Sequence, residues 1–276
     1  MKQPNYQCPL CHLPLSANVQ GFNCTNNHQF DQAKEGYVNL LPVQNKGSKV
    51  PGDSKEMIQA RRDFLASGAY AFLQQALTQQ VAKQRLIDSA VPCTVIDIGC
   101  GEGYYTNALS SLSPDYPIYG VDISKSAVRL AAKRYKTVDF SVASHLNLPF
   151  ADNSAELVSK VFAPMTAKEV LRVLKSDGLL LSVVPGPKHL FELKQIIYDN
   201  ANEHQVEDCP AGFELIESQA ISTSQTLTDA AQITNLTQMT PLAWKISDNE
   251  KQQLIDSCCF SVTFDFVINV YRVVAD

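Results

Sequence analysis

Short apolar segments alternate with amphipathic ones through the middle of the chain. Five apolar segments predict strands, and their ranges are 94–98, 116–121, 138–142, 157–162 and 179–184. Apolar residues at helical spacing predict helices over 54–86, with a break at 67–69, and over 126–135 and 167–174. Strands that alternate with helices are typical of a parallel sheet covered on both faces. The pattern therefore predicts an α/β fold with a mostly parallel sheet.

The two ends of the chain follow other patterns. Residues 34–42 end at Pro42 and predict one strand, and the Gly- and Pro-containing stretch 45–53 predicts a linker. Near the C-terminus, 213–219 and 260–273 predict two more strands. The last of these has the longest apolar alternation in the chain. We expect it to be an antiparallel partner near the edge of the sheet.

Composition narrows the class of protein. The chain has 276 residues, of which 45% are apolar, and it has no apolar run long enough to span a membrane. The first ten residues lack the pattern of a signal peptide. The sequence therefore predicts a soluble cytoplasmic protein with no membrane partner. The formal net charge of −5 argues, taken alone, against a nucleic-acid partner.

The charges are unevenly distributed, which weakens that argument. A basic segment near the predicted linker contains Lys46, Lys49, Lys55, Arg61 and Arg62 against two acidic residues. A second group, with Arg129, Lys133, Arg134 and Lys136, belongs to the predicted helix 126–135. The first cluster could contact an RNA stem or be a solvated linker, and we expect the second to be an ordinary solvated surface.

Three of the eight cysteines lie together near the N-terminus. Two residues separate Cys8 from Cys11, and three separate Cys24 from His28. Two such pairs can close a tetrahedron around Zn²⁺. His12 competes for the fourth position, but it directly follows Cys11 and is poorly placed to reach the same ion. Four protein ligands leave no position for a reactive water, so we predict a structural zinc; the alternative is three reduced cysteines beside a surface histidine.

A glycine-rich loop follows the first strand of the central region. The run Asp97-Ile98-Gly99-Cys100-Gly101-Glu102-Gly103 precedes a predicted helix, and its glycines let the backbone approach a ligand closely. Its spacing is tighter than the dinucleotide fingerprint, so we interpret it as a site for a cationic ligand without phosphates, such as S-adenosylmethionine. Asp122 ends the next strand, where a carboxylate can accept both ribose hydroxyls. Ser144 and His145 follow the third strand, at the expected height of the adenine.

This combination resembles the class I S-adenosylmethionine-dependent methyltransferases, which have a Rossmann-like sheet. In that group an acid near positions 144–146 often binds the adenine amino group, and this chain has Ser144 and His145 there, so the backbone could make that contact. A narrower resemblance appears when the zinc motif is read together with the runs 30–42, 51–54, 57–62, 97–106, 185–190 and 239–244. Together these segments are similar, across essentially the whole chain, to bacterial 23S rRNA (guanine-N1)-methyltransferases of the RlmA family.

The resemblance implies a specific function. It implies methylation of a guanine N1 in the helix 35 hairpin of 23S rRNA, closer to the branch that acts at position 745 than to the one that acts three nucleotides away. It also implies that the zinc module takes part in RNA recognition and that the enzyme is a homodimer. Cofactor contacts are implied for Tyr70, Gly101, Glu102 and His189, with the neighbouring loop residues Gly103 and Tyr104.

The substrate side is less defined. Phe162, Ala163 and Pro164 follow the fourth strand, where base-modifying methyltransferases place residues that hold the substrate. Phe162 could stack on a flipped base or belong to the core. Guanine N1 must also lose a proton, and His189 is one candidate acceptor by its chemistry. The sequence does not identify that acceptor.

Two other functions fit part of the sequence. A class I methyltransferase that acts on a small molecule would share the Leu148-Pro149-Phe150 segment, and a non-catalytic zinc-containing RNA adaptor could retain the fold. We expect three parts: a zinc-binding RNA-recognition domain (1–45), a basic linker with helices (46–90) and a methyltransferase domain (91–276). If the first part is independent, Cys24→Ser unfolds it while cofactor binding is retained.

Overall fold

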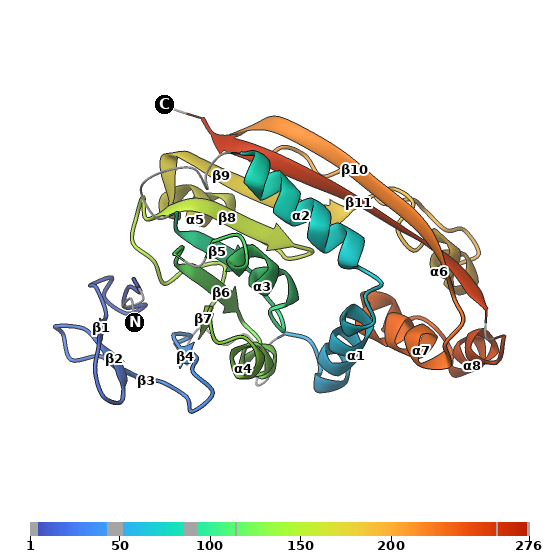
Figure 1. The fold of residues 1–276 in the computed structure, drawn as a ribbon, viewed down its shortest axis with the longest axis horizontal. Helices are drawn as coiled ribbons and strands as arrows, with labels where there is room; N and C mark the ends of the chain where they lie inside the picture. Colours follow the sequence, from blue (N-terminus) through green and yellow to red (C-terminus); the bar gives the residue numbers. More distant parts are fainter. Residues whose placement is uncertain (1–4, 43–51, 85–92, 114, 258, 275–276) are drawn as a thin grey trace.

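The structure is a computed structural model that describes residues 5–42, 52–84, 93–113, 115–257 and 259–274. Its strands form an antiparallel sheet in the order β1-β2-β3 and a large sheet in the order β10-β11-β9-β8-β5-β6-β7-β4 (Figure 1). The strands are β1 (Ser16–Ala17), β2 (Gly21–Asn23), β3 (Gln29–Asp31), β4 (Val38–Asn39), β5 (Val95–Ile98), β6 (Ile118–Asp122), β7 (Asp139–Val142), β8 (Ala155–Val161), β9 (Leu174–Pro185), β10 (Phe213–Leu227) and β11 (Phe260–Val273). The helices are α1 (Lys55–Ala66), α2 (Ala71–Lys83), α3 (Tyr104–Ser110), α4 (Lys125–Arg134), α5 (Ala167–Val173), α6 (Phe191–Ile197), α7 (Ala230–Met239), the 3₁₀ helix η3 (Pro241–Trp244) and α8 (Asp248–Asp256).

The large sheet has a parallel centre and an antiparallel end. The strands from β4 to β9 in the sheet order run parallel, whereas β11 is antiparallel to both β9 and β10. The chain order reverses direction between β5 and β8, because β6 and β7 lie on one side of β5 and β8 and β9 on the other. Ligands bind at such a switch point in open α/β sheets, outside the carboxyl ends of the strands. The predicted mostly parallel α/β fold is confirmed.

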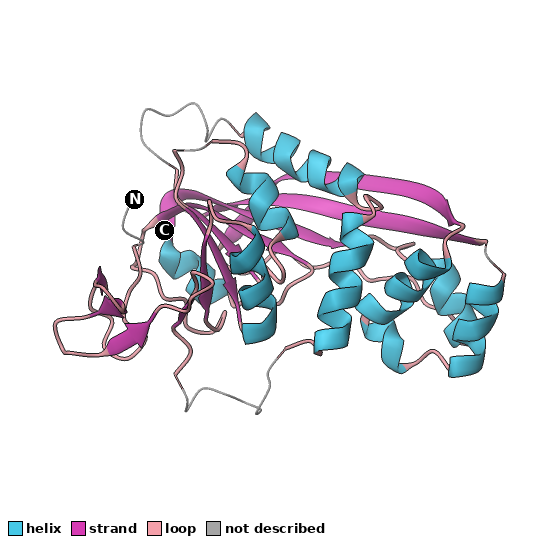
Figure 2. Cartoon of the chain, turned by 60° about the horizontal axis from the view of Figure 1, so that its bottom comes forward, coloured by secondary structure: helices cyan, strands magenta, loops and turns pink. Residues whose placement is uncertain are grey.

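Both faces of the sheet are covered (Figures 1 and 2). Successive residues of a strand point to opposite faces, and neighbours in β5 show the division. Val95 belongs to a core cluster that includes apolar residues of α2, α3 and α4. Ile96 belongs to a second cluster that includes apolar residues of α5 and of residues 5–42, the N-terminal module. The N-terminal module therefore occupies the place that a helix takes in many α/β sheets.

The N-terminal module is joined to the large sheet in two ways. β4 pairs in parallel with β7 and adds an eighth strand, and Leu40 N–H donates to the Val142 carbonyl at 2.9 Å. The buried Tyr6 packs edge-on against Tyr119, with ring centroids 5.5 Å apart, and also against Phe150 at 5.6 Å. Figure 1 shows β1–β3 beside β4 at the end of the sheet. The module and the sheet thus share one core.

Most predicted elements are confirmed, and the differences have local causes. The break near 67–69 is a turn in which Gly68 has a φ of +84°. The strand expected over 34–42 is reduced to β4, because a turn closed by the Ala33 N–H to Tyr37 carbonyl bond uses its first residues. β10 extends beyond the expected 213–219, and the expected 260–273 matches β11, which lies one strand in from the edge. The prediction missed α6, α7 and α8, although Ser247 and Glu250 form a capping box at α8.

In the described parts of the chain, no helix has both the length and the apolar character needed to cross a membrane.

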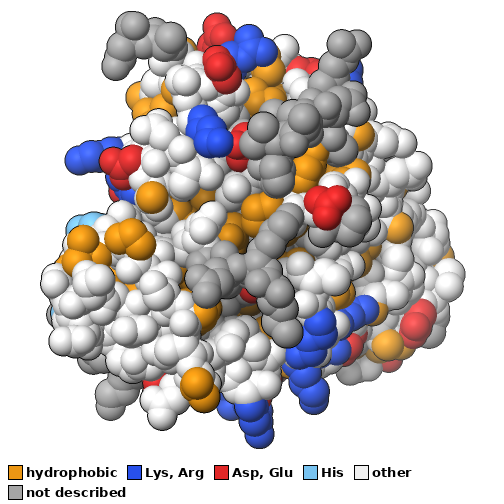
Figure 3. Space-filling model, turned by 60° about the vertical axis from the view of Figure 1, so that its left-hand side comes forward, with side chains coloured by type: hydrophobic (Ala, Val, Ile, Leu, Met, Phe, Trp, Pro, Cys, Tyr) orange, Lys and Arg blue, Asp and Glu red, His pale blue; other side chains and the backbone are white. Residues whose placement is uncertain are grey.

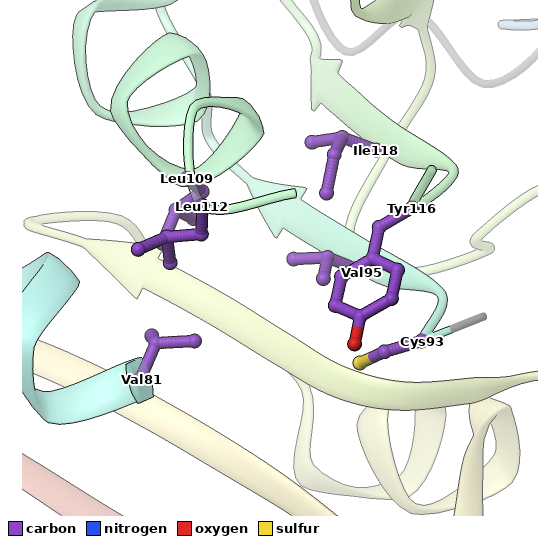
Figure 4. Close-up of a pocket in the computed structure, with 7 residues that line it drawn as sticks. All are labelled: Val81, Cys93, Val95, Leu109, Leu112, Tyr116 and Ile118. Carbon is purple, nitrogen blue, oxygen red and sulfur yellow. The ribbon is translucent and has the colours of Figure 1, made fainter. Parts of the chain in front are cut away.

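An apolar cavity of about 10 Å³ lies among Val81, Val95, Leu109, Ile118 and neighbouring side chains (Figure 4). Val95 and Ile118 are the first residues of β5 and β6, so this cavity lies at the amino ends of the strands. A space of this size holds at most one water molecule, so it is a packing defect of the core and not a ligand site.

Candidate functional site

The four predicted zinc ligands converge in the N-terminal module. The donor atoms of Cys8, Cys11, Cys24 and His28 all lie within 4.8 Å of one another. The Cys11 and Cys24 sulfurs are 3.7 Å apart, and His28 Nδ1 lies 3.5 Å from Cys8 Sγ and 3.4 Å from Cys24 Sγ. Tetrahedral zinc with ordinary bond lengths would separate such atoms by about 3.5–3.8 Å. The donor set fits a structural zinc, whereas the side chain of His12 is exposed outside the cluster.

Positive φ angles shape the glycine loop between β5 and α3. Gly99, Gly101 and Gly103 have φ values of +68°, +55° and +86°. A Cβ at Gly99 would lie 2.3 Å from Ala163 Cβ, whereas a Cβ at Gly101 would meet nothing within 4 Å. The loop is therefore packed against the segment after β8 and open above Gly101. This open backbone is suited to the close approach of a ligand.

Two carboxylates hold the glycine loop. Asp97 is buried and accepts hydrogen bonds from Thr106 Oγ1 and Ser159 Oγ, both at 2.5 Å. Burial raises the pKa of Asp97 to about 6, although these hydrogen bonds oppose the shift. Asp122, at the end of β6, accepts from the Gly101 N–H at 2.9 Å through Oδ2 and from the Ser124 N–H at 2.7 Å through Oδ1. Asp97 is thus engaged inside the protein, while the half-buried Asp122 lies beside the open part of the loop.

Glu102 is the third acidic group of this region. It is 4% exposed, and neither of its carboxylate oxygens has a hydrogen-bond partner among the described residues. Arg134 Nη1 lies 3.7 Å from one oxygen. Burial raises the pKa of Glu102 to about 7, and the positive charges of Arg134 and Arg62 oppose this shift. Tyr104, the next predicted contact, begins α3 and lies edge-on to Tyr105 at 5.0 Å.

The segment after β7, residues 144–150, is named here the β7 loop. Ser144 is buried and accepts from the Leu146 N–H at 3.2 Å. His145 Nδ1 lies 3.2 Å from Thr166 Oγ1, and burial lowers the pKa of His145, which favours its neutral form. The β7 loop therefore offers a fixed backbone and neutral side chains. None of residues 144–146 is an acid.

Aromatic rings gather near the carboxyl ends of β8 and β9, against the middle of β11. The His189 ring lies 4.6 Å from the Phe266 ring, and the Tyr70 ring lies 5.1 Å from Phe266 on another side. Burial lowers the pKa of His189 to about 3, and its Nδ1 accepts from the Asp265 N–H at 3.4 Å. His189 is therefore a neutral ring with the proton on Nε2. Such a weak base is poorly suited to take a proton from guanine N1.

Phe162 is the exposed member of this aromatic group. Its φ is +55°, a backbone region that bulky residues rarely adopt, and its side chain is 43% exposed. The ring is stacked on His189 with an interplanar angle of 20° and a centroid distance of 6.3 Å. Ala163 follows against Gly99, and Pro164 is exposed. Strained residues cluster at functional sites, so the geometry favours a role for Phe162 in binding over a role in the core.

The basic segment near the linker is only partly described. Lys46 and Lys49 lie outside the described residues. Arg61 donates through Nη1 to Asp53 at 2.5 Å and through Nη2 to the Met239 carbonyl at 3.0 Å. Arg61 therefore ties α1 to α7 and is not a free RNA-binding charge.

The second basic group lies on α4. Arg129 Nε donates to Glu35 at 2.8 Å, which links α4 to the N-terminal module. Lys133 and Arg134 are exposed at the end of the same helix, and the exposed Lys136 follows it. Figure 3 shows Lys and Arg side chains gathered along the lower part of the face that carries the module. Arg129 and Arg134 have acidic partners and Lys136 Nζ donates to the Glu35 and Ala132 carbonyls, so most of this cluster is engaged within the protein.

The geometry brings the predicted residues to the carboxyl ends of the parallel strands. The glycine loop, Asp122, the β7 loop and the aromatic group border one region. Sequence reasoning missed the hydroxyl pair Thr106 and Ser159, and it missed Arg134 beside Glu102. Thr106 lies nine residues after Asp97 on a predicted helix, so the sequence could have indicated this contact. Ser159 of β8 is distant in the sequence, and its contact with Asp97 had no such signal.

The comparisons with known proteins agree with this geometry. The RlmA N-terminal zinc-ribbon family matches residues 6–49, and a methyltransferase domain family matches residues 90–245. The 23S rRNA (guanine(748)-N(1))-methyltransferase of Streptomyces fradiae is 32% identical over 250 residues, which cover 88% of this chain and 87% of the relative. YxjB of Bacillus subtilis (strain 168), whose name provisionally gives it 23S rRNA (guanine-N1) activity, is 30% identical over 273 residues and 94% of each chain.

The zinc-ribbon match includes the Cys and His cluster, and the methyltransferase-domain match includes the glycine loop and Asp122. The two relatives are similar to this chain over about nine tenths of its length. The chain therefore belongs to the family of 23S rRNA (guanine-N1)-methyltransferases that carry an RlmA zinc ribbon.

Proposed function

We propose that this protein transfers a methyl group from S-adenosylmethionine to N1 of a guanine in 23S rRNA. The observation that carries the proposal is the presence, in one chain, of an RlmA zinc ribbon and a class I methyltransferase site, in a family whose named members act on this atom. A small-molecule substrate would not account for the zinc ribbon. A non-catalytic adaptor would not need the open glycine loop with Asp122 beside it.

Different residues at the strand ends bind different parts of the cofactor. The open backbone at Gly101 fits close approach of the cofactor, and Asp122 is placed to accept ribose hydroxyls. We assign the adenine to the β7 loop at Ser144 and His145, and the remainder to Tyr70, His189 and the loop residues Gly99, Glu102, Gly103 and Tyr104. Asp97 acts by holding the loop. The bound cofactor supplies an electrophilic methyl group, so the main task of the protein is to position the guanine.

The substrate side of the site begins at Phe162. Its exposed ring, held against His189, can stack on a guanine that has left the RNA stem, and Ala163 and Pro164 continue the same surface. His189 carries its proton on Nε2 and is a weak base, so it does not accept the guanine proton.

The finer parts of the proposal concern the RNA and the assembly. We propose that Cys8, Cys11, Cys24 and His28 bind the structural zinc and that the 1–45 region contributes to RNA recognition. The helix 35 hairpin, position 745 and a homodimer are proposed on the sequence resemblance, and a cytoplasmic location is proposed on the composition of the chain. The relative from Streptomyces fradiae carries position 748 in its name, so the methylated position needs direct mapping.

Reverse transcription tests the function directly. The protein is incubated with labelled S-adenosylmethionine and unmodified 23S rRNA, and stops in primer extension are mapped. N1 methylation blocks Watson–Crick pairing, so we expect a new stop in helix 35, one nucleotide before the modified base. Label without a stop would exclude the N1 position, and label found only in small molecules would favour the alternative substrate class.

A further inference from the structure

The β7 loop is held from two sides. On one side is α5, where Glu169 accepts from the Leu148 N–H at 2.9 Å and Arg172 donates to the Leu148 and Phe150 carbonyls at 2.9 and 2.8 Å. Glu169 and Arg172 also pair with each other at 2.9 Å. This side is a conventional polar clamp inside the methyltransferase fold. It fixes the end of the loop that lies farther from Ser144.

On the other side, the loop is held by the residues that flank Cys8. The Gln7 N–H donates to the Pro149 carbonyl at 2.9 Å. Asn147 Nδ2 donates to the Pro9 carbonyl at 3.4 Å. One hydrogen bond therefore comes from the residue before this predicted zinc ligand, and the other goes to the residue after it. No residue of α5 replaces these two contacts in the described structure.

The conformation of this flanking backbone depends on the zinc site. Cys8 and Cys11 belong to one tight turn, which is closed by the His12 N–H to Cys8 carbonyl bond at 2.9 Å. Cys8 is fully buried, in the same core cluster as Leu148 and Phe150 of the β7 loop. A short module with few core residues gains much of its folding free energy from its metal. The metal therefore helps to hold the Pro9 carbonyl and the Gln7 N–H in the orientation in which they bond to the β7 loop.

We propose that the first zinc turn, residues 8–11, positions the adenine side of the cofactor site, so that zinc loading sets the affinity for S-adenosylmethionine. Asn147 is the positioning residue that carries this coupling, since its side chain joins the turn to the loop that holds Ser144 and His145. The inference rests on the proposed placement of adenine at the β7 loop. It gives the zinc ribbon a second role, beside RNA recognition, and it contradicts the expectation that the zinc module and the cofactor site are independent.

The first test measures cofactor affinity without RNA. Isothermal titration calorimetry compares the full-length protein with zinc bound and after chelation, with circular dichroism to verify that the sheet remains folded. We expect cofactor affinity to fall on the order of tenfold or more on zinc removal and to return when zinc is restored, because the metal organises the turn. Unchanged affinity in the folded, zinc-free protein would overturn the proposal.

The second test leaves the zinc in place. Asn147→Ala removes the bond to Pro9, and we expect about threefold to tenfold weaker binding of both S-adenosylmethionine and free adenosine, as for one lost hydrogen bond. We expect the KM for the cofactor to rise while kcat and the bound zinc stay unchanged. Asn147→Asp cannot donate and should behave in the same way.

Asn18→Ala is the matched control. Asn18 Oδ1 accepts from the Gln20 and Gly21 N–H groups at 2.8 and 2.9 Å inside the zinc ribbon and does not contact the β7 loop. We expect this variant to lose some stability in the ribbon but to keep its zinc, and therefore to keep its cofactor affinity. Equal losses of affinity in Asn147→Ala and Asn18→Ala would show a general loss of stability and would reject the positioning role. Loss of rRNA methylation with zinc-dependent cofactor binding intact would refute only the proposed function.

Discussion

The two ends of the large sheet are completed by different means. At one end, β4 contributes only two residues, and the N-terminal module with its Cys and His cluster packs beside it. At the other end, β10 contributes fifteen residues and pairs with β11, and its neighbour β11 carries the buried rings of Phe264 and Phe266. One end therefore depends on a metal site, and the other on a long strand pair with an aromatic core.

This difference also divides the ligand site. The N-terminal module holds the β7 loop, where we place the adenine, and the aromatic group holds Phe162 and His189, where we place the reacting end and the guanine. Metal loss should therefore act on the adenine end of the cofactor, and changes in the aromatic core should act on its reacting end and on the guanine. The predictions below test that division, from the largest expected effect to the smallest.

Replacing Cys8 by Ser should have the largest effect. Cys8 is fully buried in a core cluster that also contains Ile96 and Tyr119 of the large sheet. Loss of the metal should therefore weaken the packing of the N-terminal module and of the sheet face that it covers. We expect the free energy of unfolding to fall by about 5 kcal/mol or more. Thermal unfolding followed by circular dichroism should show one transition moved to lower temperature. A second transition that stays at the original temperature would instead show that module and sheet are independent.

Phe266→Ala tests the opposite end. The Phe266 ring is fully buried and lies 5.1 Å from Tyr70, 4.6 Å from His189 and 5.3 Å from Phe162. We expect a loss of about 3–5 kcal/mol in unfolding free energy, because the substitution leaves a cavity among these rings. Denaturant unfolding measures the loss, and Phe266→Leu should recover most of it.

The zinc content of Phe266→Ala tests whether the two ends of the large sheet are independent. Phe266 belongs to the core cluster that excludes the N-terminal cysteines. We therefore expect Phe266→Ala to bind one equivalent of zinc, as the unchanged protein does, when measured by a colorimetric chelator. Loss of zinc from this variant would mean that the two ends are coupled through the sheet.

The sequence predicted local features well because they depend on neighbouring residues. The spacing of Cys8 and Cys11 and the order of glycines in 99–103 are set by a single turn each, and the structure shows both. The break at Gly68 is likewise local. The packing of Tyr6 on Tyr119 and the bond from Asn147 to Pro9 join positions more than one hundred residues apart, and no periodicity in the sequence records them.

The role of single site residues was predictable only in part. Asp97 was visible as an acid before the glycine loop, but Ser159, its partner from β8, becomes its neighbour only when β5 and β8 pair. The φ of +55° at Phe162 had no sequence signal, since glycine is the residue expected there. Such strain is maintained by surrounding tertiary contacts, and it therefore appears only in the folded chain.

Glu102→Gln tests a group that lies near neither end of the sheet. Burial raises the pKa of Glu102 to about 7 from an ordinary value near 4.5, so the folded state binds this proton more tightly than the unfolded state. The contribution of Glu102 to stability is therefore fully present below about pH 4.5 and is lost as the pH rises to about 7. We expect Glu102→Gln to be more stable than the unchanged protein by about 2 kcal/mol at pH 8 and similar to it at pH 4.5.

Thermal unfolding across this pH range measures the effect, and Glu192→Gln is a control of opposite sign. Glu192 is partly buried, but it accepts hydrogen bonds from the Thr263 N–H and hydroxyl, which lower its pKa overall. Its substitution should therefore destabilise the protein at neutral pH. If Glu102→Gln is also destabilising at pH 8, the ion pair with Arg134 outweighs the burial of the carboxylate.

Phe162→Ala should have the smallest effect and the most selective one. The ring is exposed, so its loss changes stability little, but it removes the surface on which we place the guanine. We expect kcat/KM for the RNA to fall about tenfold, at the lower end of the range for one base–aromatic stack. Cofactor affinity should change less than about twofold by calorimetry, since hydrogen bonds at the other end of the site hold the adenine loop.

Phe162→Tyr and Leu146→Ala complete this test. Tyr keeps an aromatic face and should retain most of the activity on RNA. Leu146 is 66% exposed on the β7 loop, outside the aromatic group, so its truncation should leave kcat/KM for the RNA unchanged. If Phe162→Ala instead weakens cofactor binding as much as RNA methylation, Phe162 contacts the cofactor and its assignment to the guanine is wrong.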